Sequence, residues 1–166
     1  MSALAAQTIL EGMLAIAITR AIETGAAADR VQEGKRFAYF DVLSWAKNQA
    51  EVMDMPFADP GIAALDPYSL LGQGVLPAFS RGPEPTTGEP RAHAVLEQAL
   101  ELALEHALES RAKAAADPFE AGALQGYHEL IAFALTQARA RGLAFANRTL
   151  AAFDPNDLLK PAKQTA

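Results

Sequence analysis

The sequence predicts an all-α, single-domain helical bundle built from two tandem copies of one helix–helix–short helix unit. Strong helix formers, led by alanine, fill the long segments, and no segment shows the alternation of a strand or the turn signal of a hairpin. The second half of the chain also repeats the first. Residues 26–71 align with 114–159 at a constant offset of 88, and 17 of the 46 positions are identical. We expect the two copies to be related by a pseudo-two-fold axis.

Composition excludes several classes of function. A content of 51% hydrophobic and 20% charged residues is typical of a compact soluble chain. The net charge of −6 and the scattered basic residues argue against a nucleic-acid partner, because phosphate contacts need clustered lysine and arginine. The absence of cysteine excludes disulfides, thiolate metal sites and cysteine nucleophiles, and it fits a cytoplasmic location.

The repeat divides the domain, residues 1–166, into three parts. We place repeat 1 at about 3–72, a proline- and glycine-rich linker at about 73–90, and repeat 2 at about 91–160. The first helix, about 3–24, has its counterpart at about 91–114, where aligned residues such as Leu10 and Leu96 differ by 86. The second, about 30–53, matches about 118–141. The apolar stretch 9–22 contains Glu11 and Arg20 and lacks a basic start. We therefore expect a buried helix there, with no membrane span.

Short signals mark where these helices begin and end. Asp117-Pro118 is a good helix start, and Gly142 is a natural stop. The counterpart of Gly142 is Asp54, so we expect the first copy to end differently. Asp-Pro pairs also start a short element in each copy, at 66–67 and 154–155, and the leucine pairs 70–71 and 158–159 are expected to dock it. Asp59-Pro60 offers a further start in the first copy only.

Paired polar residues are the candidates for a binding site. Gln49 and Gln137 lie within the apolar stripe of the second helix, beside small residues such as Ala46 and Ala50 that favour close packing of this helix on its copy. Each glutamine is either hydrogen-bonded at that seam or reaches water at its border. Tyr39 and Tyr127, each followed two residues later by an acid, either line a symmetric cleft or are core rings with surface hydroxyls.

Two matched glutamates complete the set of candidates. Glu11 and Glu97 each lie on a long apolar helix, either on a narrow solvated strip or as partly buried carboxylates suited to acid–base chemistry. The inter-repeat cleft would thus be lined by the following residues: Tyr39, Gln49, Tyr127, Gln137, Glu11 and Glu97. No catalytic arrangement of serine, histidine and acid is recognisable, and no His-Glu-x-x-His or Glu-x-x-His metal motif occurs. We expect no metal and no cofactor.

The two copies of the first helix differ in polarity. The second has a charged face of Glu97, Glu101, Glu105 and Glu109, whereas the first is apolar almost all round. Something must cover that face. The candidates are the linker, through Val75, Leu76 and Phe79, or a partner subunit. We therefore expect an interface that includes these residues: Ile9, Met13, Ile16, Leu76 and Phe79.

These observations favour a non-enzymatic protein-interaction module, such as an adaptor, a chaperone or an immunity-type inhibitor. A protein partner or self-association is expected, without nucleic acid. The alternative is a small-molecule binder or enzyme with a cleft at the axis between the repeats.

Overall fold

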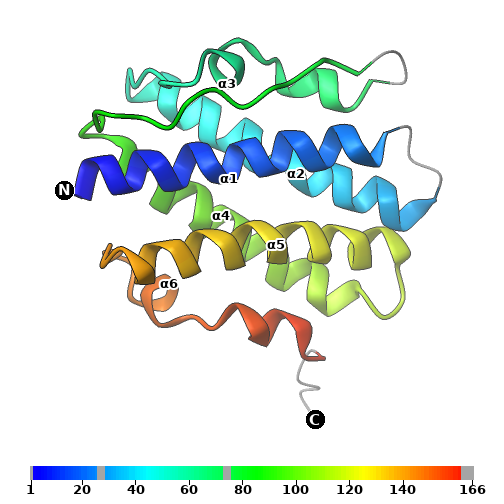
Figure 1. Cartoon of the computed structure of the whole chain (residues 1–166). Coiled ribbons are helices and arrows are strands. Elements are labelled where there is room, and N and C mark those ends of the chain that lie inside the picture. The colour runs from blue at the N-terminus through cyan, green and yellow to red at the C-terminus, as the bar shows by residue number, and fades with distance from the viewer. Residues whose placement is uncertain (1, 26–28, 73–75, 162–166) are drawn as a thin grey trace.

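The computed structural model describes residues 2–25, 29–72 and 76–161, and it folds them into an all-helical bundle (Figure 1). Four long helices are α1 (Ser2–Thr24), α2 (Arg30–Val52), α4 (Ala92–Lys113) and α5 (Pro118–Ala140). The short elements are α3 (Pro60–Ala64) and α6 (Arg148–Ala152), each followed by a 3₁₀ helix, η1 (Pro67–Leu70) and η2 (Pro155–Leu159). The described residues contain no strand, so the predicted all-α class is confirmed.

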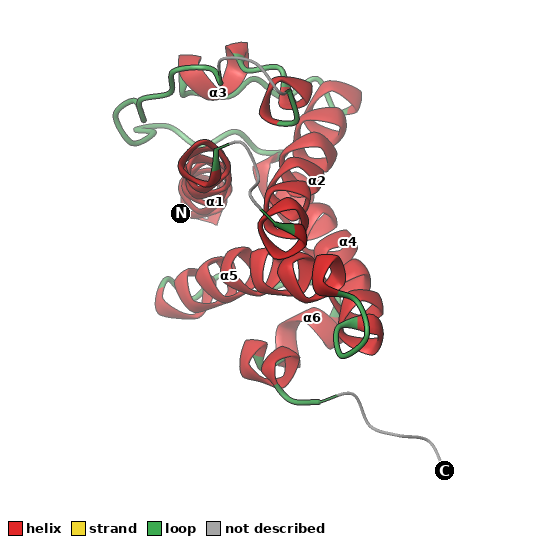
Figure 2. Ribbon diagram, turned by 90° about the vertical axis from the view of Figure 1, so that its right-hand side faces the viewer, coloured by secondary structure: helices red, strands yellow, loops and turns green. Residues whose placement is uncertain are grey.

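The short elements lie on opposite sides of the bundle (Figures 1 and 2). In both views α3 lies above the long helices, whereas α6 lies below them. The four long helices pack on one another between these two sides, and α2 and α5 form the most extensive helix pair. Val75 and residues 162–166 lie outside the described residues.

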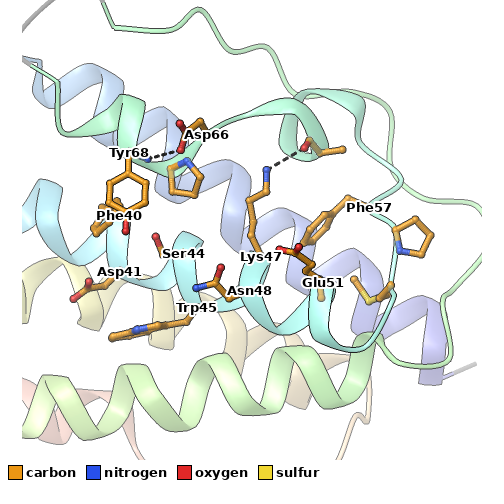
Figure 3. A pocket seen from close by; sticks show the side chains of 15 residues that line it. Phe40, Asp41, Ser44, Trp45, Lys47, Asn48, Glu51, Phe57, Asp66 and Tyr68 are labelled. Atoms are coloured by element: carbon orange, nitrogen blue, oxygen red, sulfur yellow. Dashed lines mark hydrogen bonds between the residues drawn. The ribbon is translucent and has the colours of Figure 1, made fainter.

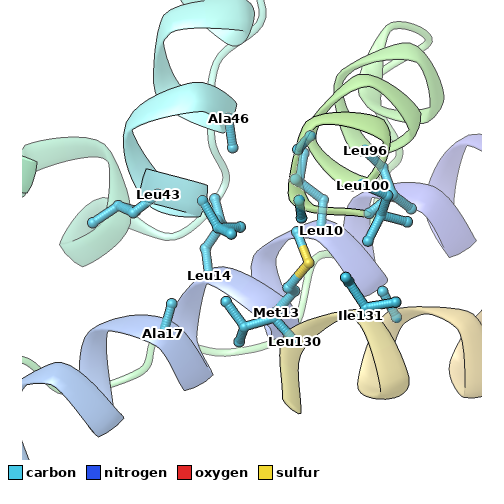
Figure 4. Packing of buried hydrophobic residues seen from close by; sticks show 14 of the residues in the cluster. Leu10, Met13, Leu14, Ala17, Leu43, Ala46, Leu96, Leu100, Leu130 and Ile131 are labelled. Carbon is cyan, nitrogen blue, oxygen red and sulfur yellow. The ribbon is translucent and has the colours of Figure 1, made fainter. Parts of the chain in front are cut away.

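The core is formed where the apolar faces of the four long helices meet (Figure 4). Large side chains from each helix are fully buried there, including Leu14 of α1, Leu43 of α2, Leu100 of α4 and Leu130 of α5. Burial of each such side chain contributes about 1.5–3 kcal/mol to stability. Helix α1 is the most interior, because an uninterrupted run from Ala6 to Ala15 is buried.

Two glycines allow α2 and α5 to touch backbone to backbone. A Cβ atom at Gly34 would lie 1.9 Å from the carbonyl oxygen of Phe119, and a Cβ atom at Gly122 would lie 1.9 Å from the carbonyl oxygen of Val31. No side chain fits at either position. The backbones meet here, near the start of each helix, although Ala46 and Ala50 are buried as well.

The ends of α2 and α5 correct one expectation from the sequence. Both helices end in the same motif, with 2.8 Å bonds from Met55 N to Ala50 O and from Leu143 N to Ala138 O. Gly142 supplies the left-handed residue of that motif in the second copy, with φ of 68°. Asp54 adopts φ of 52° in the first copy. The expectation that the first copy ends differently was therefore wrong, since aspartate tolerates this conformation better than most residues.

The short elements correct two more expectations. The second copy does have a helix at the position of α3, because Asn147 replaces the Asp-Pro start and accepts a 2.9 Å bond from Leu150 N. Leu70 and Leu158 are fully buried and dock their elements, and Leu71 is half-buried, whereas Leu159 is 60% exposed and does not dock.

The described part of the linker, from Leu76 onward, runs along α1 (Figure 1). Glu89 N donates to Gln7 Oε1 at 2.9 Å, and Gly88 lies so close to α1 that a Cβ atom there would be 2.2 Å from Leu4 N. Phe79 packs against Gly61 at the start of α3. The linker thus covers a large part of the apolar α1 face.

Replacing the left-handed aspartate should stabilise the fold. We expect Asp54→Gly to raise the free energy of unfolding by about 0.5–1 kcal/mol, because glycine adopts this φ without strain. Gly142→Ala should lower it by about 1 kcal/mol, although nothing lies within 4 Å of the new Cβ atom. Denaturant unfolding of both variants measures the two effects, and equal signs would contradict this explanation.

Filling the helix contact should be far more damaging. We expect Gly34→Ala to lower the free energy of unfolding by about 2 kcal/mol or more, because the added methyl group meets backbone that cannot move aside. Gly72→Ala is the matched control, since its Cβ atom would have only an ordinary 3.6 Å contact with Ser69 O. Thermal unfolding compares the two variants, and similar losses would refute the backbone contact.

Candidate functional site

The contact between α2 and α5 creates two tyrosine–carboxylate pairs. Tyr39 of α2 donates a 2.7 Å hydrogen bond to Glu129 Oε1 of α5, and Tyr127 of α5 donates a 2.6 Å bond to Asp41 Oδ2 of α2. Both tyrosines are only 3% exposed. The matched tyrosines and acids of the sequence therefore bond crosswise, each tyrosine to the acid of the other helix.

A basic side chain from a long neighbouring helix stands beside each pair. Arg20 of α1 bonds Glu129 at 3.1 Å and Glu23 at 3.0 Å. At the other pair, His106 of α4 packs against Trp45 with ring centroids 4.7 Å apart. Burial raises the pKa of Asp41 above its ordinary value, and the bond from Tyr127 and the nearby His106 only partly offset this rise.

The two pairs line separate hollows rather than one cleft. The Tyr39 hollow is about 370 Å³ and includes Arg20 and Glu129, whereas the Tyr127 hollow is about 320 Å³ and includes Trp45 and His106. Neither Gln49 nor Gln137 is among the lining residues of either hollow.

Both glutamines are half-buried at the edge of the apolar stripe. Within the described residues, neither side chain makes a hydrogen bond to the protein. The structure therefore does not bring the glutamines together with the tyrosines, and the binding role of this set stays a prediction.

The matched glutamates hold loops. Glu11 is 2% exposed and accepts bonds from Ala58 N at 3.0 Å and Asp59 N at 2.7 Å, while Gln7 of the same helix donates to it at 2.5 Å. Glu97 makes the same kind of contact at lower burial, accepting from the backbone N–H groups that precede α6. These bonds satisfy loop N–H groups that would otherwise be costly to bury. A structural role accounts for both carboxylates.

The residues expected at an interface occupy different depths. Ile9 and Met13 are buried in the core, with exposed fractions of 1% and 0%. Ile16, Leu76 and Phe79 are half-buried. Since the linker lies on α1, the face that needed a cover is in part covered by the chain itself.

A groove along α2, at a surface that the sequence did not indicate, is larger than either tyrosine hollow. This α2 groove, about 680 Å³, lies between the outer face of α2 and the chain that carries α3 and η1 (Figure 3). Its polar side chains are Asp41, Ser44, Lys47, Asn48, Glu51 and Asp66, and its aromatic ones are Phe40, Trp45, Phe57 and Tyr68. The groove therefore has both polar and aromatic surfaces open to solvent.

A signal for this groove was present in the repeat. Phe40 and Tyr68 are aromatic in the first copy, but their counterparts are His128 and Asn156. In the structure these two rings pack together, with centroids 5.2 Å apart, and Tyr68 is 71% exposed. Aromatic residues that one copy has and the other lacks would have pointed to this surface.

Lys47 closes one side of the groove and is already occupied. Its ammonium group donates to three backbone carbonyls, those of Ile62 at 2.7 Å, Ala63 at 3.0 Å and Leu65 at 2.5 Å. Burial lowers the pKa of Lys47, and the nearby Asp66 partly offsets this effect. The lysine therefore serves to hold the α3–η1 chain against α2.

The described residues were compared with the requirements for a metal site and for a membrane-spanning helix. Across residues 2–25, 29–72 and 76–161, no three His, Asp or Glu side chains gather closely enough to hold a metal ion. Helix α1 is long and apolar enough to cross a membrane by length and composition, but 67% of its most apolar window is buried inside the bundle. Buried core helices of soluble proteins and signal sequences near an N-terminus both have this length and composition.

Comparison of the chain with known protein families, with curated proteins and with solved structures finds no match. The geometry and charge of the hollows are therefore the basis for assigning a function.

The buried tyrosines give a pH dependence with a definite sign. Burial and then the carboxylate bonds raise the pKa of Tyr39 and Tyr127 above the ordinary 10.0. The folded chain thus keeps two protons that the unfolded chain loses. Stability is fully present below pH 10 and falls as the pH rises above it, by up to about 1.4 kcal/mol per pH unit for each tyrosine.

Alkaline titration followed by phenolate absorbance and circular dichroism tests this expectation. We expect the phenolate signal of Tyr39 and Tyr127 to appear only together with loss of helix. The double variant Tyr39→Phe and Tyr127→Phe should lose that part of the signal and depend less steeply on pH. Deprotonation of these tyrosines well before unfolding would show that they are not buried against carboxylates.

Proposed function

We propose that the protein is a non-enzymatic binding module, and that its α2 groove receives an extended, basic segment of a partner protein. The observation that carries the proposal is the excess of carboxylates in the groove over available cations. Asp41, Glu51 and Asp66 line it, and the ammonium group of Lys47 is held by three carbonyls. A protein with a net charge of −6 also attracts basic partners over longer distances.

Polar side chains along α2 are placed to bind a partner's backbone. Ser44, Asn48 and Glu51 follow one another at helical spacing on the groove side of α2 (Figure 3). Within the described residues they make no hydrogen bond to the protein, so their donors and acceptors are free for a ligand. An extended segment presents a backbone N–H or C=O group at each residue, and such a row of side chains can satisfy them.

Aromatic walls would anchor the partner's apolar side chains. Tyr68 and Phe40 form one wall, and Trp45 and Phe57 contribute from other sides of the groove. Exposed tyrosine and tryptophan dominate the energetics of many protein interfaces because they bury a large area with few rotatable bonds. A basic residue next to an apolar one in the partner would fit this combination.

The second copy supports a special role for the first. Arg139 stands at the position that corresponds to Glu51, and its guanidinium donates to the carbonyls of Ala151 and Phe153. These carbonyls correspond to those of Ala63 and Leu65, which Lys47 binds in the first copy. The second copy therefore has a cation where the first has a carboxylate facing an open groove.

In this proposal the two copies arose by duplication of one unit, are related by pseudo-two-fold symmetry, and have since become different. Three kinds of contact recur at matched positions: the crossed tyrosine–carboxylate bonds, the loop-holding glutamates, and the paired glycines of α2 and α5. An adaptor or an immunity-type inhibitor that acts in the cytoplasm would use one specialised copy for binding and the other as support.

Panning of a phage-displayed random peptide library on the immobilised full chain tests the proposal. We expect enriched peptides with arginine or lysine beside an apolar residue, because these complement the carboxylates and the aromatic walls. Glu51→Lys and Tyr68→Ala should each weaken binding of the enriched peptides by about tenfold or more, a loss of about 1.4 kcal/mol.

Glu105→Lys on the exposed face of α4 is the matched control for charge, and it should leave the affinity within about twofold. Lack of enrichment, or enriched peptides that bind Glu51→Lys as well as the unmodified chain, would overturn the proposal.

A further inference from the structure

We propose that a further hollow, between α1 and α5, binds a small carboxylic acid with an apolar body. This Arg81 hollow is about 460 Å³ and is lined by Ala15, Ile16, Arg20, Arg81 and Phe133, with Thr19 and Glu129 at its edge. It is separate from the α2 groove, with which it shares no lining residue. Its volume is within the range of small-molecule sites in proteins.

The inner surface of the hollow is apolar. Ala15 is 5% exposed, and Ile16 and Phe133 are partly buried side chains that pack against the core. A flat ring or a branched alkyl group would bury its surface against them and gain about 25 cal/mol for each Å² of apolar area removed from water.

Arg81 supplies the cation that such a ligand needs. Its closest acidic neighbour is Glu84, and the 3.9 Å between Nη2 and Oε1 is too long for a hydrogen bond. Within the described residues its side chain makes no hydrogen bond. A guanidinium carries five N–H donors in a plane and binds a carboxylate through two of them at once.

Arg20 has a different task, because it neutralises the acid at the edge of the hollow. The carboxylate of Glu129 accepts from Arg20 at 3.1 Å and from the Tyr39 hydroxyl at 2.7 Å. Its charge is thereby balanced by Arg20, and one of its oxygens is already hydrogen-bonded to Tyr39. An incoming carboxylate consequently meets less repulsion than the presence of a glutamate suggests.

Gly12 of α1 leaves room for the Phe133 ring and for the Arg81 guanidinium. A Cβ atom at this position would lie 3.1 Å from Phe133 Cζ and 3.4 Å from Arg81 Nη2. Any larger side chain would displace the ring or the guanidinium. The counterpart of Gly12 in the second copy is Gln98, so this space belongs to the first copy.

The matched positions of the second copy are negatively charged, whereas those of the first copy are neutral. Glu101 replaces Ala15 and Glu105 replaces Thr19, and both glutamates are exposed on α4. A carboxylate would be repelled there. The first copy therefore differs at several neighbouring positions, and each difference favours an apolar anion.

Isothermal titration calorimetry with two matched probes tests the inference. The probes are 2-naphthoate, which has the apolar body and the carboxylate, and 2-naphthamide, which has the same body without charge. We expect the full chain to bind 2-naphthoate at least about tenfold more tightly than 2-naphthamide. Arg81→Gln should remove this preference, and Arg81→Lys should keep part of it as a point charge.

Arg148→Gln is the matched control, because it removes an exposed arginine on α6 far from the hollow. It should leave both affinities unchanged, and circular dichroism should show equal helix content in all variants. Failure of 2-naphthoate to bind at millimolar concentration, equal affinity for the two probes, or an unchanged preference in Arg81→Gln would each overturn the inference.

Discussion

The whole arrangement depends on the backbone contact between α2 and α5. At Gly34 and Gly122 the two helices approach so closely that a backbone carbonyl oxygen of the opposite helix occupies the space that a Cβ atom would fill. This short distance places Tyr39 and Tyr127 within reach of acids on the opposite helix. The crossing also divides the space beside the helices, so that two hollows form instead of one cleft. A wider separation would break both tyrosine bonds and merge or empty these spaces.

Much of the fold followed from local signals in the sequence. The four long helices, the start of α5 at Asp117-Pro118, and the short elements after Asp66 and Asp154 are where periodicity and capping chemistry place them. The failures came where a residue other than the preferred one does the same task. Asp54 takes a glycine's conformation, and Asn147 takes the place of an Asp-Pro start. Such replacements cost little free energy, so residue preferences alone do not predict them.

The candidate sites were harder to predict, because they depend on three-dimensional neighbours. Matched identities in the repeat drew attention to Tyr39, Glu11 and Gln49, yet the first two are satisfied within the fold, and the third lines neither hollow. The open grooves instead involve positions at which the copies differ, such as Tyr68 and Ala15, and the linker residue Arg81. Shared residues preserve the common scaffold. Residues that differ are free to acquire separate tasks, and only coordinates reveal which of them meet.

Lys47 and Arg139 have a consequence for how such a protein can change over time. They lie about one helical turn apart in the alignment of the copies, yet each holds the same pair of carbonyls at the end of its own short helix. Because both side chains are long and flexible, the residue that binds these carbonyls can stand at either of two positions along the helix. A long basic side chain can therefore hold the same carbonyls from either of two neighbouring turns, and the other turn is left free to carry a different residue, as Glu51 does in the α2 groove.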